Sequence, residues 1–258
     1  MAGPYFERRP KLASLSHYFV NLILFSEEEA NRPLPLTDPR ATHLLKVLRR
    51  TVGESFDAGL VNGPKGRGTL VEQANESLVL TFAWEGPPPP ADNLTLLLGL
   101  PRPQTARDIL RDATTLGVAA LHFVRTRRCE ASYADSTLWR GDEWRKHLLA
   151  GAAQAFATQI PAVTNSLTLS ASLDALPADG IRLALDNYEA PVALAEVRLP
   201  RDSGVTLAFG PERGWTAEDR TLLRGHGFDF VHLGTRVLRL ETAVTAALTL
   251  VKSARGSL

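Results

Sequence analysis

The sequence predicts an α/β protein: a parallel sheet in the larger, C-terminal part, preceded by a small β-rich domain. Three observations lead to this prediction. After residue 93, apolar runs alternate with helical patterns. The apolar runs are continuous, as expected for strands that are covered on both faces of a sheet. A proline-rich stretch, residues 84–92, separates the two patterns, and its four successive prolines favour a stiff, extended linker.

The composition of the 258-residue chain bounds its function. With 44% hydrophobic and 22% charged residues, the chain can bury a large core divided between two domains. A net charge of +1 leaves RNA binding to local clusters of arginine and lysine. The single cysteine, Cys129, cannot form an internal disulfide, which fits the cytoplasm. None of the six histidines has a metal-binding spacing and no apolar run matches a membrane span, so we expect neither a metal nor a membrane.

The first part of the chain divides into a flexible extension, residues 1–17, and a β-rich domain, residues 18–83. The extension carries basic residues without the apolar core of a signal peptide. An apolar strand is expected over residues 18–25, and short strands over residues 54–58, 68–73 and 77–84. The basic turn at residues 62–68 superficially resembles the G-x-x-G clamp of KH domains, but a hairpin turn suits its β-rich flanks better.

One helix is expected in this first domain. Asp38 supplies an N-cap, Pro39 takes the first helical position, and the helix runs to residue 49 or 50. Leu44, Leu45 and Leu48 recur at helical spacing and face the core. The remaining surface is basic, which makes it a candidate RNA-binding face. This face consists of His43, Lys46, Arg49 and Arg50.

Strands and helices alternate over residues 93–258. Strands are expected over residues 94–100, 119–124, 181–186, 205–209 and 228–233, and helices over residues 106–116, 143–156, 217–224 and 241–251. Strand, helix and strand at this spacing indicate a parallel sheet with helices on its faces. Because α/β folds bind ligands at the carboxyl ends of their strands, the loops after these strands are candidate sites.

The turn after strand 205–209 has glycines where the backbone must bend sharply or approach a ligand. Thr216 and Asp219 then form a shortened capping box for the next helix. The glycine spacing is neither that of a dinucleotide fingerprint nor that of a P-loop. An ordinary strand-to-helix turn explains the same residues, so both interpretations stand. The turn consists of Gly210, Pro211, Glu212, Arg213 and Gly214.

The turn after strand 228–233 is more specific. Arg236 and Arg239 are three residues apart and share one face if the segment has begun to coil, so that they could grip phosphates or carboxylates. Glu241 and Thr242 stand at the start of the last helix, where a carboxylate offsets the positive end of the dipole. A capped helix with solvated arginines is the alternative.

Polar residues also follow two other predicted strands. Arg125, Arg127 and Arg128 come directly after strand 119–124, where they could contact an RNA backbone or form a solvated charge run. Asp186 and Glu189 end strand 181–186, where they could polarise a ligand or cap the loop.

With these residues in this order, the chain resembles the RsmE family of 16S ribosomal RNA uridine-N3 methyltransferases, which belong to the SPOUT class of knotted methyltransferases. The resemblance covers about residues 18–252. The matching residues are His43 with residues 45–49, Gly117 with Val118, Gln154 with Ile160 and Pro161, Gly210 to Glu212 with Gly214, and Leu233, Gly234, Arg236, Leu238, Arg239, Glu241, Thr242 and Ala243.

This resemblance implies a PUA-like RNA-binding barrel over residues 18–83, then a SPOUT methyltransferase domain over residues 93–258 with a C-terminal trefoil knot, a topology that is otherwise rare. It also implies a cytoplasmic homodimer that acts on the RNA of the small ribosomal subunit. Backbone groups of three loops would hold S-adenosylmethionine. In this chain those loops correspond to Leu98, Gly99 and Leu100; to Phe209, Gly210, Pro211, Glu212 and Gly214; and to Leu233, Gly234 and Leu238.

Methyl transfer from a sulfonium cofactor requires the protein to position uridine N3 and to favour the deprotonated base. Arg236 and Arg239 are therefore the catalytic candidates, as groups that stabilise the anion or hold a phosphate. The chain departs from the family pattern at four positions: Arg213 for glycine, Thr235 for proline, Ala153 for glutamate and Ala157 for arginine.

Two further interpretations stand beside this one: a non-catalytic RNA-binding or ribosome-assembly protein on the same fold, and a methyltransferase with a different substrate.

Overall fold

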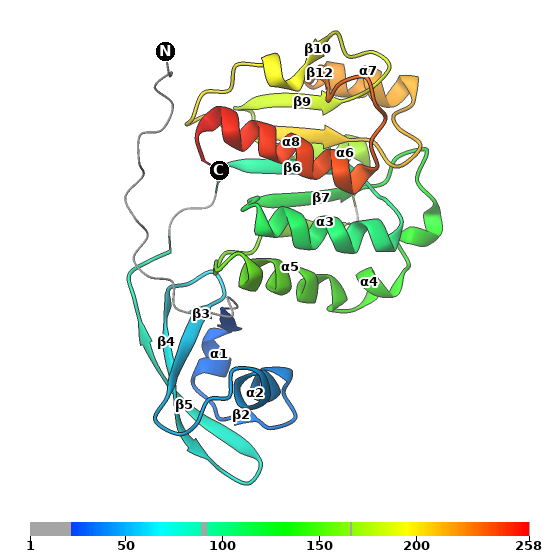
Figure 1. The fold of residues 1–258 in the computed structure, drawn as a ribbon. Coiled ribbons are helices and arrows are strands. Elements are labelled where there is room, and N and C mark those ends of the chain that lie inside the picture. Colours follow the sequence, from blue (N-terminus) through cyan, green and yellow to red (C-terminus); the bar gives the residue numbers. More distant parts are fainter. Residues whose placement is uncertain (1–21, 89–91, 166, 258) are drawn as a thin grey trace, which may run out of the picture.

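The computed structural model describes residues 22–88, 92–165 and 167–257 and shows a small sheet domain below a larger α/β domain (Figure 1). The extension expected over residues 1–17 and the first residues of the strand expected over 18–25 lie outside this described part. The same holds for residues 89–91 of the linker. No helix among the described residues is both long and apolar enough to pass through a lipid bilayer.

The small domain contains a five-stranded sheet in the order β1-β3-β4-β5-β2. β3, β4 and β5 form an antiparallel meander, so the basic turn between β3 and β4 is a hairpin turn, as predicted. β1 pairs with β3 in parallel. The rings of Phe25, Phe56 and Phe82 meet in the core under this sheet. The strands are β1 (Ile23–Phe25), β2 (Leu34–Pro35), β3 (Ser55–Leu60), β4 (Lys65–Gln73) and β5 (Ser77–Trp84).

Two short helices, α1 (Glu27–Ala30) and α2 (Pro39–Thr42), belong to this domain. The predicted cap is confirmed: Asp38 Oδ1 accepts a hydrogen bond from the Arg40 N–H at 2.8 Å. The predicted helix is present, but it ends before residue 49 or 50 and changes type, because a π-helical turn, η1 (His43–Val47), follows α2. In this turn, the Leu48 N–H donates to the His43 carbonyl at 2.9 Å. Apolar spacing does not distinguish a π turn from an α turn.

The larger domain contains a seven-stranded sheet in the order β10-β12-β9-β11-β6-β7-β8. All of its strand pairs are parallel, which confirms the predicted parallel sheet. Five of the strands lie within one or two residues of their predicted positions. β8 and β10 were not predicted, because two or three residues are too few to leave a pattern. The strands are β6 (Leu94–Gly99), β7 (Ala120–Val124), β8 (Ala162–Thr164), β9 (Ile181–Leu185), β10 (Val192–Ala193), β11 (Val205–Phe209) and β12 (Asp229–His232).

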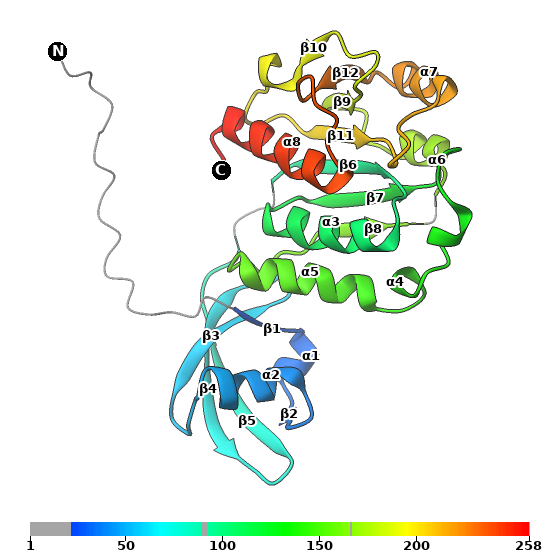
Figure 2. The ribbon, with the colours of Figure 1, turned by 45° about the vertical axis from the view of Figure 1, so that its right-hand side comes forward.

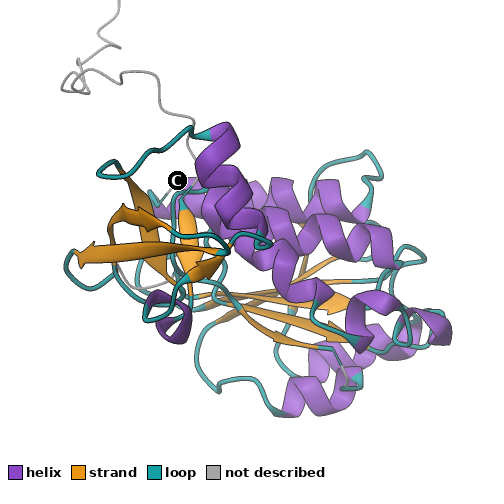
Figure 3. Ribbon diagram, turned by 90° about the horizontal axis from the view of Figure 1, so that it is seen from below, coloured by secondary structure: helices purple, strands orange, loops and turns teal. Residues whose placement is uncertain are grey.

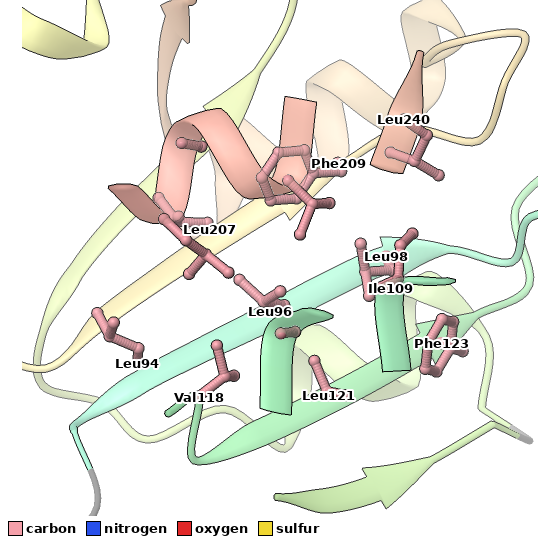
Figure 4. Close-up of a cluster of buried hydrophobic side chains, with 14 of the residues drawn as sticks. Leu94, Leu96, Leu98, Ile109, Val118, Leu121, Phe123, Leu207, Phe209 and Leu240 are labelled. Atoms are coloured by element: carbon pink, nitrogen blue, oxygen red, sulfur yellow. The ribbon is translucent and has the colours of Figure 1, made fainter. Parts of the chain in front are cut away.

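Helices cover both faces of this sheet (Figures 2 and 3). Along β6, Leu96 and Leu98 pack with residues of α3 and α8 on one face (Figure 4). Leu97 points to the opposite face, where it packs with residues of α6 and α7. Both faces of the central strands are therefore apolar, as their continuous runs predicted. The helices are α3 (Pro103–Thr115), α4 (Thr137–Arg140), α5 (Glu143–Gln154), α6 (Leu169–Asp174), α7 (Ala217–Gly225) and α8 (Leu240–Arg255).

Hydrogen bonds join the two domains at the β3–β4 turn. The Asn62 N–H donates to the carbonyl of Thr158 at 2.8 Å, and the Thr158 hydroxyl donates to the carbonyl of Gly63 at 2.7 Å. The Lys65 ammonium donates to the carbonyl of Phe156 at 3.2 Å. Asn62 and Phe156 both have a positive φ, +59° and +53°, an uncommon conformation for residues other than glycine. The joint is thus built from specific contacts in addition to the linker.

Candidate functional site

A cavity of about 760 Å³ lies at the carboxyl edge of the parallel sheet. The strands β9, β11 and β12 are neighbours that all end at this edge, since β9 pairs in parallel with both of the others. The loops after these strands line the cavity together with the start of α3. We name them the tyrosine loop (residues 186–189), the glycine loop (residues 210–215) and the C-terminal loop (residues 233–239). The last two meet at one edge, as predicted.

The glycine loop folds back on itself. A Cβ atom on Gly210 would lie about 3 Å from backbone atoms of Gly214 and Trp215, closer than real Cβ contacts normally come. Gly214 has a φ of +69°, and its N–H donates to the carbonyl of Pro211 at 2.7 Å. Both glycines are therefore required by the turn itself. The predicted capping box follows directly, with hydrogen bonds of 3.0 and 3.1 Å between Thr216 and Asp219.

Side chains fix the glycine loop to its surroundings. The carboxylate of Glu212 accepts hydrogen bonds from the backbone N–H and the Nε of Arg102, at 3.0 and 3.3 Å. Arg128 donates to the carbonyl of Arg213 at 2.6 Å, and the Arg213 guanidinium lies 3.3 Å from a carboxylate oxygen of Glu130. The arginine that replaces the usual glycine thus joins this loop to the segment after β7.

The basic segment after β7 also lies near the start of α7. Backbone and hydroxyl hydrogen bonds at the start of α7 lower the pKa of Glu218, with the backbone N–H of Glu218 contributing most. The nearby charges of Arg127 and Arg128 lower it further. The predicted basic segment after β7 therefore lies beside the glycine loop.

The three residues predicted at the end of β6 lie under the cavity and are not among its lining residues. Leu98 and Leu100 are buried in the core. A Cβ atom on Gly99 would lie 2.4 Å from Pro211 Cδ and 2.6 Å from the Pro211 nitrogen, so the glycine lets the glycine loop rest directly on β6. Their contact with the site is indirect, because β6 pairs with β11 and carries the loop above it.

The C-terminal loop is the more open wall. Leu233, Arg236, Leu238 and Arg239 line the cavity, whereas Gly234 does not. Between residues 235 and 239, no backbone N–H donates to an acceptor within the described part of the chain. The guanidinium groups of Arg236 and Arg239 are exposed and have no ion pair among residues 22–88, 92–165 and 167–257. Backbone and side-chain donors are both available to a ligand here.

This loop has not begun to coil, so the condition under which Arg236 and Arg239 would share a helical face is not met. α8 starts at Leu240, and Arg239 is its N-cap residue with an extended backbone (φ −63°, ψ 152°). Gly234 bends the backbone at the start of the loop with a φ of +111°, and the extended Arg239 keeps the backbone non-helical up to Leu240. Glu241 stands in the first turn of α8, as predicted. Both arginines still line one cavity, because the extended loop, and not a shared helical face, brings them to it.

The tyrosine loop is a wall that sequence reasoning did not assign to the cofactor. Asp186, Asn187 and Tyr188 line the cavity. Asp186 also caps its loop: its Oδ1 accepts hydrogen bonds from the N–H groups of Tyr188 and Glu189, at 2.6 and 2.8 Å. The sequence had marked Asp186 and Glu189 after this strand as able to polarise a ligand or cap the loop, and the structure shows the cap; Tyr188 itself was not singled out.

The structure does not bring the two predicted RNA-binding groups together. Lys46 and Arg49 are exposed on the small domain, whereas His43 and Arg50 beside them are half-buried. Arg127 and Arg128 belong instead to the larger domain, next to the glycine loop, and Arg125 begins the same segment directly after β7. If both groups contact RNA, they contact separate parts of it.

Comparisons with known proteins bear on this site. The family described as RNA methyltransferase domain matches residues 87–252. The ribosomal RNA small subunit methyltransferase E of Treponema pallidum is 34% identical over 241 residues, which are 90% of each chain. The chain belongs to this methyltransferase family. A second member, the methyltransferase E 1 of Borreliella burgdorferi, is 27% identical and is covered over 98% of its length. Membership confirms the resemblance that the motif residues indicated.

Solved structures agree with the fold of this family member. A ribosomal RNA small subunit methyltransferase E from Neisseria gonorrhoeae, bound to S-adenosyl methionine, has a TM-score of 0.73 at 24% identity, with 91% of this chain and 97% of that chain covered. A methyltransferase from Legionella pneumophila, also with bound cofactor, has a TM-score of 0.76 at 21% identity, with 91% and 98% covered. Both extend over the small domain as well as the α/β domain.

Proposed function

We propose that this family member transfers a methyl group from S-adenosylmethionine to N3 of a uridine in 16S ribosomal RNA. The observation that carries the proposal is the cavity at the carboxyl edge of the sheet, which has the glycine loop on one side and the unpaired Arg236 and Arg239 on the other. An exposed guanidinium without a carboxylate partner suits an anionic ligand.

The residues present fit the cofactor. A cavity of about 760 Å³ lies in the range of roughly 300–1,000 Å³ that small-molecule sites occupy. Apolar side chains and unpaired backbone donors of the C-terminal loop suit a nucleoside with a polar tail. The bound cofactor supplies a reactive methyl group on a positively charged sulfur. The residues that would hold it are Phe209, Gly210, Pro211, Glu212, Gly214, Leu233 and Leu238; Gly234 would bend the C-terminal loop around it, and Leu98, Gly99 and Leu100 would support the glycine loop from below.

The catalytic task of the chain is to position and polarise the base. Arg236 and Arg239 are the groups proposed for this task, because both line the cavity and neither forms an ion pair with a carboxylate of the described residues. A fixed cation beside the uracil ring favours the deprotonated N3 and stabilises the charge that develops on the ring. A guanidinium also binds a phosphate in two-point geometry, which would orient the nucleotide.

The finer features of the family are also proposed for this chain. The packing of α8 against the segment that follows β10 supports a trefoil knot: Arg255 Nε donates to the Arg201 carbonyl at 3.1 Å, and Leu194 shares a core cluster with Val244 and Leu248. The curved meander of β3, β4 and β5 and the exposed Lys46 support a PUA-like, RNA-binding small domain. A cytoplasmic homodimer that binds the small ribosomal subunit completes the proposal.

Mapping of N3-methylated uridines in ribosomal RNA, from cells with and without the protein, tests this function. We expect one modified uridine of 16S RNA to lose its methyl group when the protein is absent and to regain it on complementation. Complementation with an Arg239→Ala variant should fail. An unchanged map would contradict the proposed substrate.

Two further measurements separate the alternatives. Calorimetry with S-adenosylmethionine should show binding, whereas a folded protein that binds RNA and not the cofactor would favour the non-catalytic alternative. Weak dependence of activity on salt would favour a substrate other than RNA.

A further inference from the structure

Tyr188 is the most exposed large hydrophobic side chain in the described chain, at 82%. It stands in the tyrosine loop and lines the cavity. Single exposed apolar residues are common on proteins, so exposure by itself decides little. The surroundings of this ring are what distinguish it.

The backbone that carries the ring is firmly held. Asp186 accepts the N–H of Tyr188 at 2.6 Å on one carboxylate oxygen and Nε of Arg220 at 2.8 Å on the other. The side chains of Asp186 and Arg220 are only 2% and 10% exposed. A buried ion pair adds little net stability, because desolvation offsets the attraction of the charges. Its evident effect here is to fix the backbone of the loop that carries the ring.

The same arginine lies against the ring. The guanidinium carbon of Arg220 is 5.6 Å from the centroid of Tyr188, within the range of a cation–π contact. Because Arg220 is nearly buried and the tyrosine is nearly bare, the guanidinium supports the ring from the protein side. The outer face of the ring is left open at the mouth of the cavity.

We propose that the open face of Tyr188 stacks against a base of the RNA substrate. This inference rests on the proposed function. Proteins bind single-stranded RNA by stacking its unpaired bases on aromatic rings, and a ring that is already fixed loses little freedom when a base stacks on it. Arg236 and Arg239 line the same cavity from the C-terminal loop, where they offer charge to the phosphates of that strand. The adenine of a cofactor would need a more enclosed ring, since small-molecule sites bury most of their ligand.

Three variants of the full chain test the proposal: Tyr188→Ala, Tyr188→Leu and Tyr188→Phe. The probe is a fluorescein-labelled, uridine-rich RNA oligonucleotide, with affinity measured by anisotropy at several salt concentrations. Loss of one stacked base weakens RNA binding by roughly 5- to 150-fold, so we expect this loss for Tyr188→Ala and Tyr188→Leu. Tyr188→Phe keeps the ring and should bind within about twofold of wild type. The salt dependence should stay the same in all three, because tyrosine carries no charge.

Calorimetry with S-adenosylmethionine provides the second arm, and we expect all three variants to keep wild-type affinity for it. The proposal is overturned if Tyr188→Ala binds RNA as wild type does, if Tyr188→Phe loses as much as Tyr188→Ala, or if cofactor affinity falls while RNA affinity does not. The same measurements on the wild-type protein distinguish a failure of this proposal from a failure of the proposed function. If wild type binds the oligonucleotide and methylates small subunits, only the role of Tyr188 is in question.

Discussion

The glycine loop and the C-terminal loop follow neighbouring parts of one sheet, yet they are built in opposite ways. The glycine loop is closed on itself and joined by Glu212 to Arg102 and by Arg213 to Glu130. In the C-terminal loop, Val237 is 81% exposed, and the Gly234 N–H is the donor of a single bond, to His232 Nδ1 at 3.0 Å. The glycine loop is thus held by contacts within the protein, whereas the backbone N–H groups of residues 235–239 in the C-terminal loop have no acceptor among the described residues.

This difference separates two tasks. A wall that is already ordered loses little conformational entropy when it binds a ligand, whereas the open wall keeps its polar groups free for the RNA. We therefore expect changes to the two arginines of the C-terminal loop to act mainly on methyl transfer, and changes in the glycine loop to act mainly on stability and cofactor binding. The variants below challenge that division, from the largest expected effect to the smallest.

Replacement of Arg239 by alanine should have the largest effect. Removing one preorganised donor to a developing anion typically lowers kcat by about 100-fold or more. Affinity for S-adenosylmethionine should stay within about twofold of wild type, because the residues proposed to hold the cofactor in both loops are untouched. Single-turnover methylation of small subunits and calorimetry measure the two quantities. An equal loss of transfer and cofactor binding would assign Arg239 to the cofactor instead.

The Gly99→Ala substitution should destabilise the protein by about 1–3 kcal/mol. The added Cβ atom would lie 2.4 Å from Pro211 Cδ and force the glycine loop off β6. Urea unfolding measures the loss. Gly225→Ala is the matched control, since no atom lies within 4 Å of its added Cβ atom in the described structure and alanine is the better helix former. Equal stability of the two variants would show that the glycine loop does not depend on β6.

Loss of the Glu212 side chain should have a smaller effect. Glu212→Ala removes the acceptor for the Arg102 N–H and should lower stability by about 1 kcal/mol, because the site is partly exposed. Glu212→Gln keeps an oxygen at the same place and should restore most of this stability. Thermal unfolding of both variants gives the comparison. If the glutamine variant is as unstable as the alanine variant, charge rather than the backbone bond holds the loop.

Arg213→Gln should change stability least, by at most about 0.5 kcal/mol, because its partner Glu130 and Arg213 itself are both largely exposed. Arg128 donates to the backbone carbonyl of residue 213, so that bond survives the substitution. If Arg213 contacts an RNA phosphate, the salt dependence of RNA binding should fall by about one unit of slope. Titrations at several salt concentrations test this, and an unchanged slope would restrict Arg213 to the surface pair.

The sequence predicted the parts of this site that depend on local pattern. β11 and β12, their loops and the capping box at Thr216 were all found, because apolar runs and glycines mark them. The neighbourhood of the loops was harder to predict. Leu98 and Leu100 are buried and Gly99 lies under the glycine loop, an arrangement that follows from the pairing order of the strands and not from local pattern. The π turn at residues 43–47 and the support of Tyr188 by Arg220 likewise depend on tertiary contacts that leave no periodic trace.

The joint between the domains has a consequence for how RNA would be selected. The Asn62 N–H donates to the Thr158 carbonyl, the Thr158 hydroxyl donates to the Gly63 carbonyl, and the Ile160 N–H donates to Asn62 Oδ1, so backbone and side-chain groups together hold the joint. A joint of this kind holds the exposed Lys46 and Arg49 at a constant distance from the cavity. An RNA that contacts both the basic residues and the cavity must already be folded so that its two contact points lie at that distance. Recognition would then measure the shape of an assembled particle, and an unfolded strand with the same uridine would reach only one end.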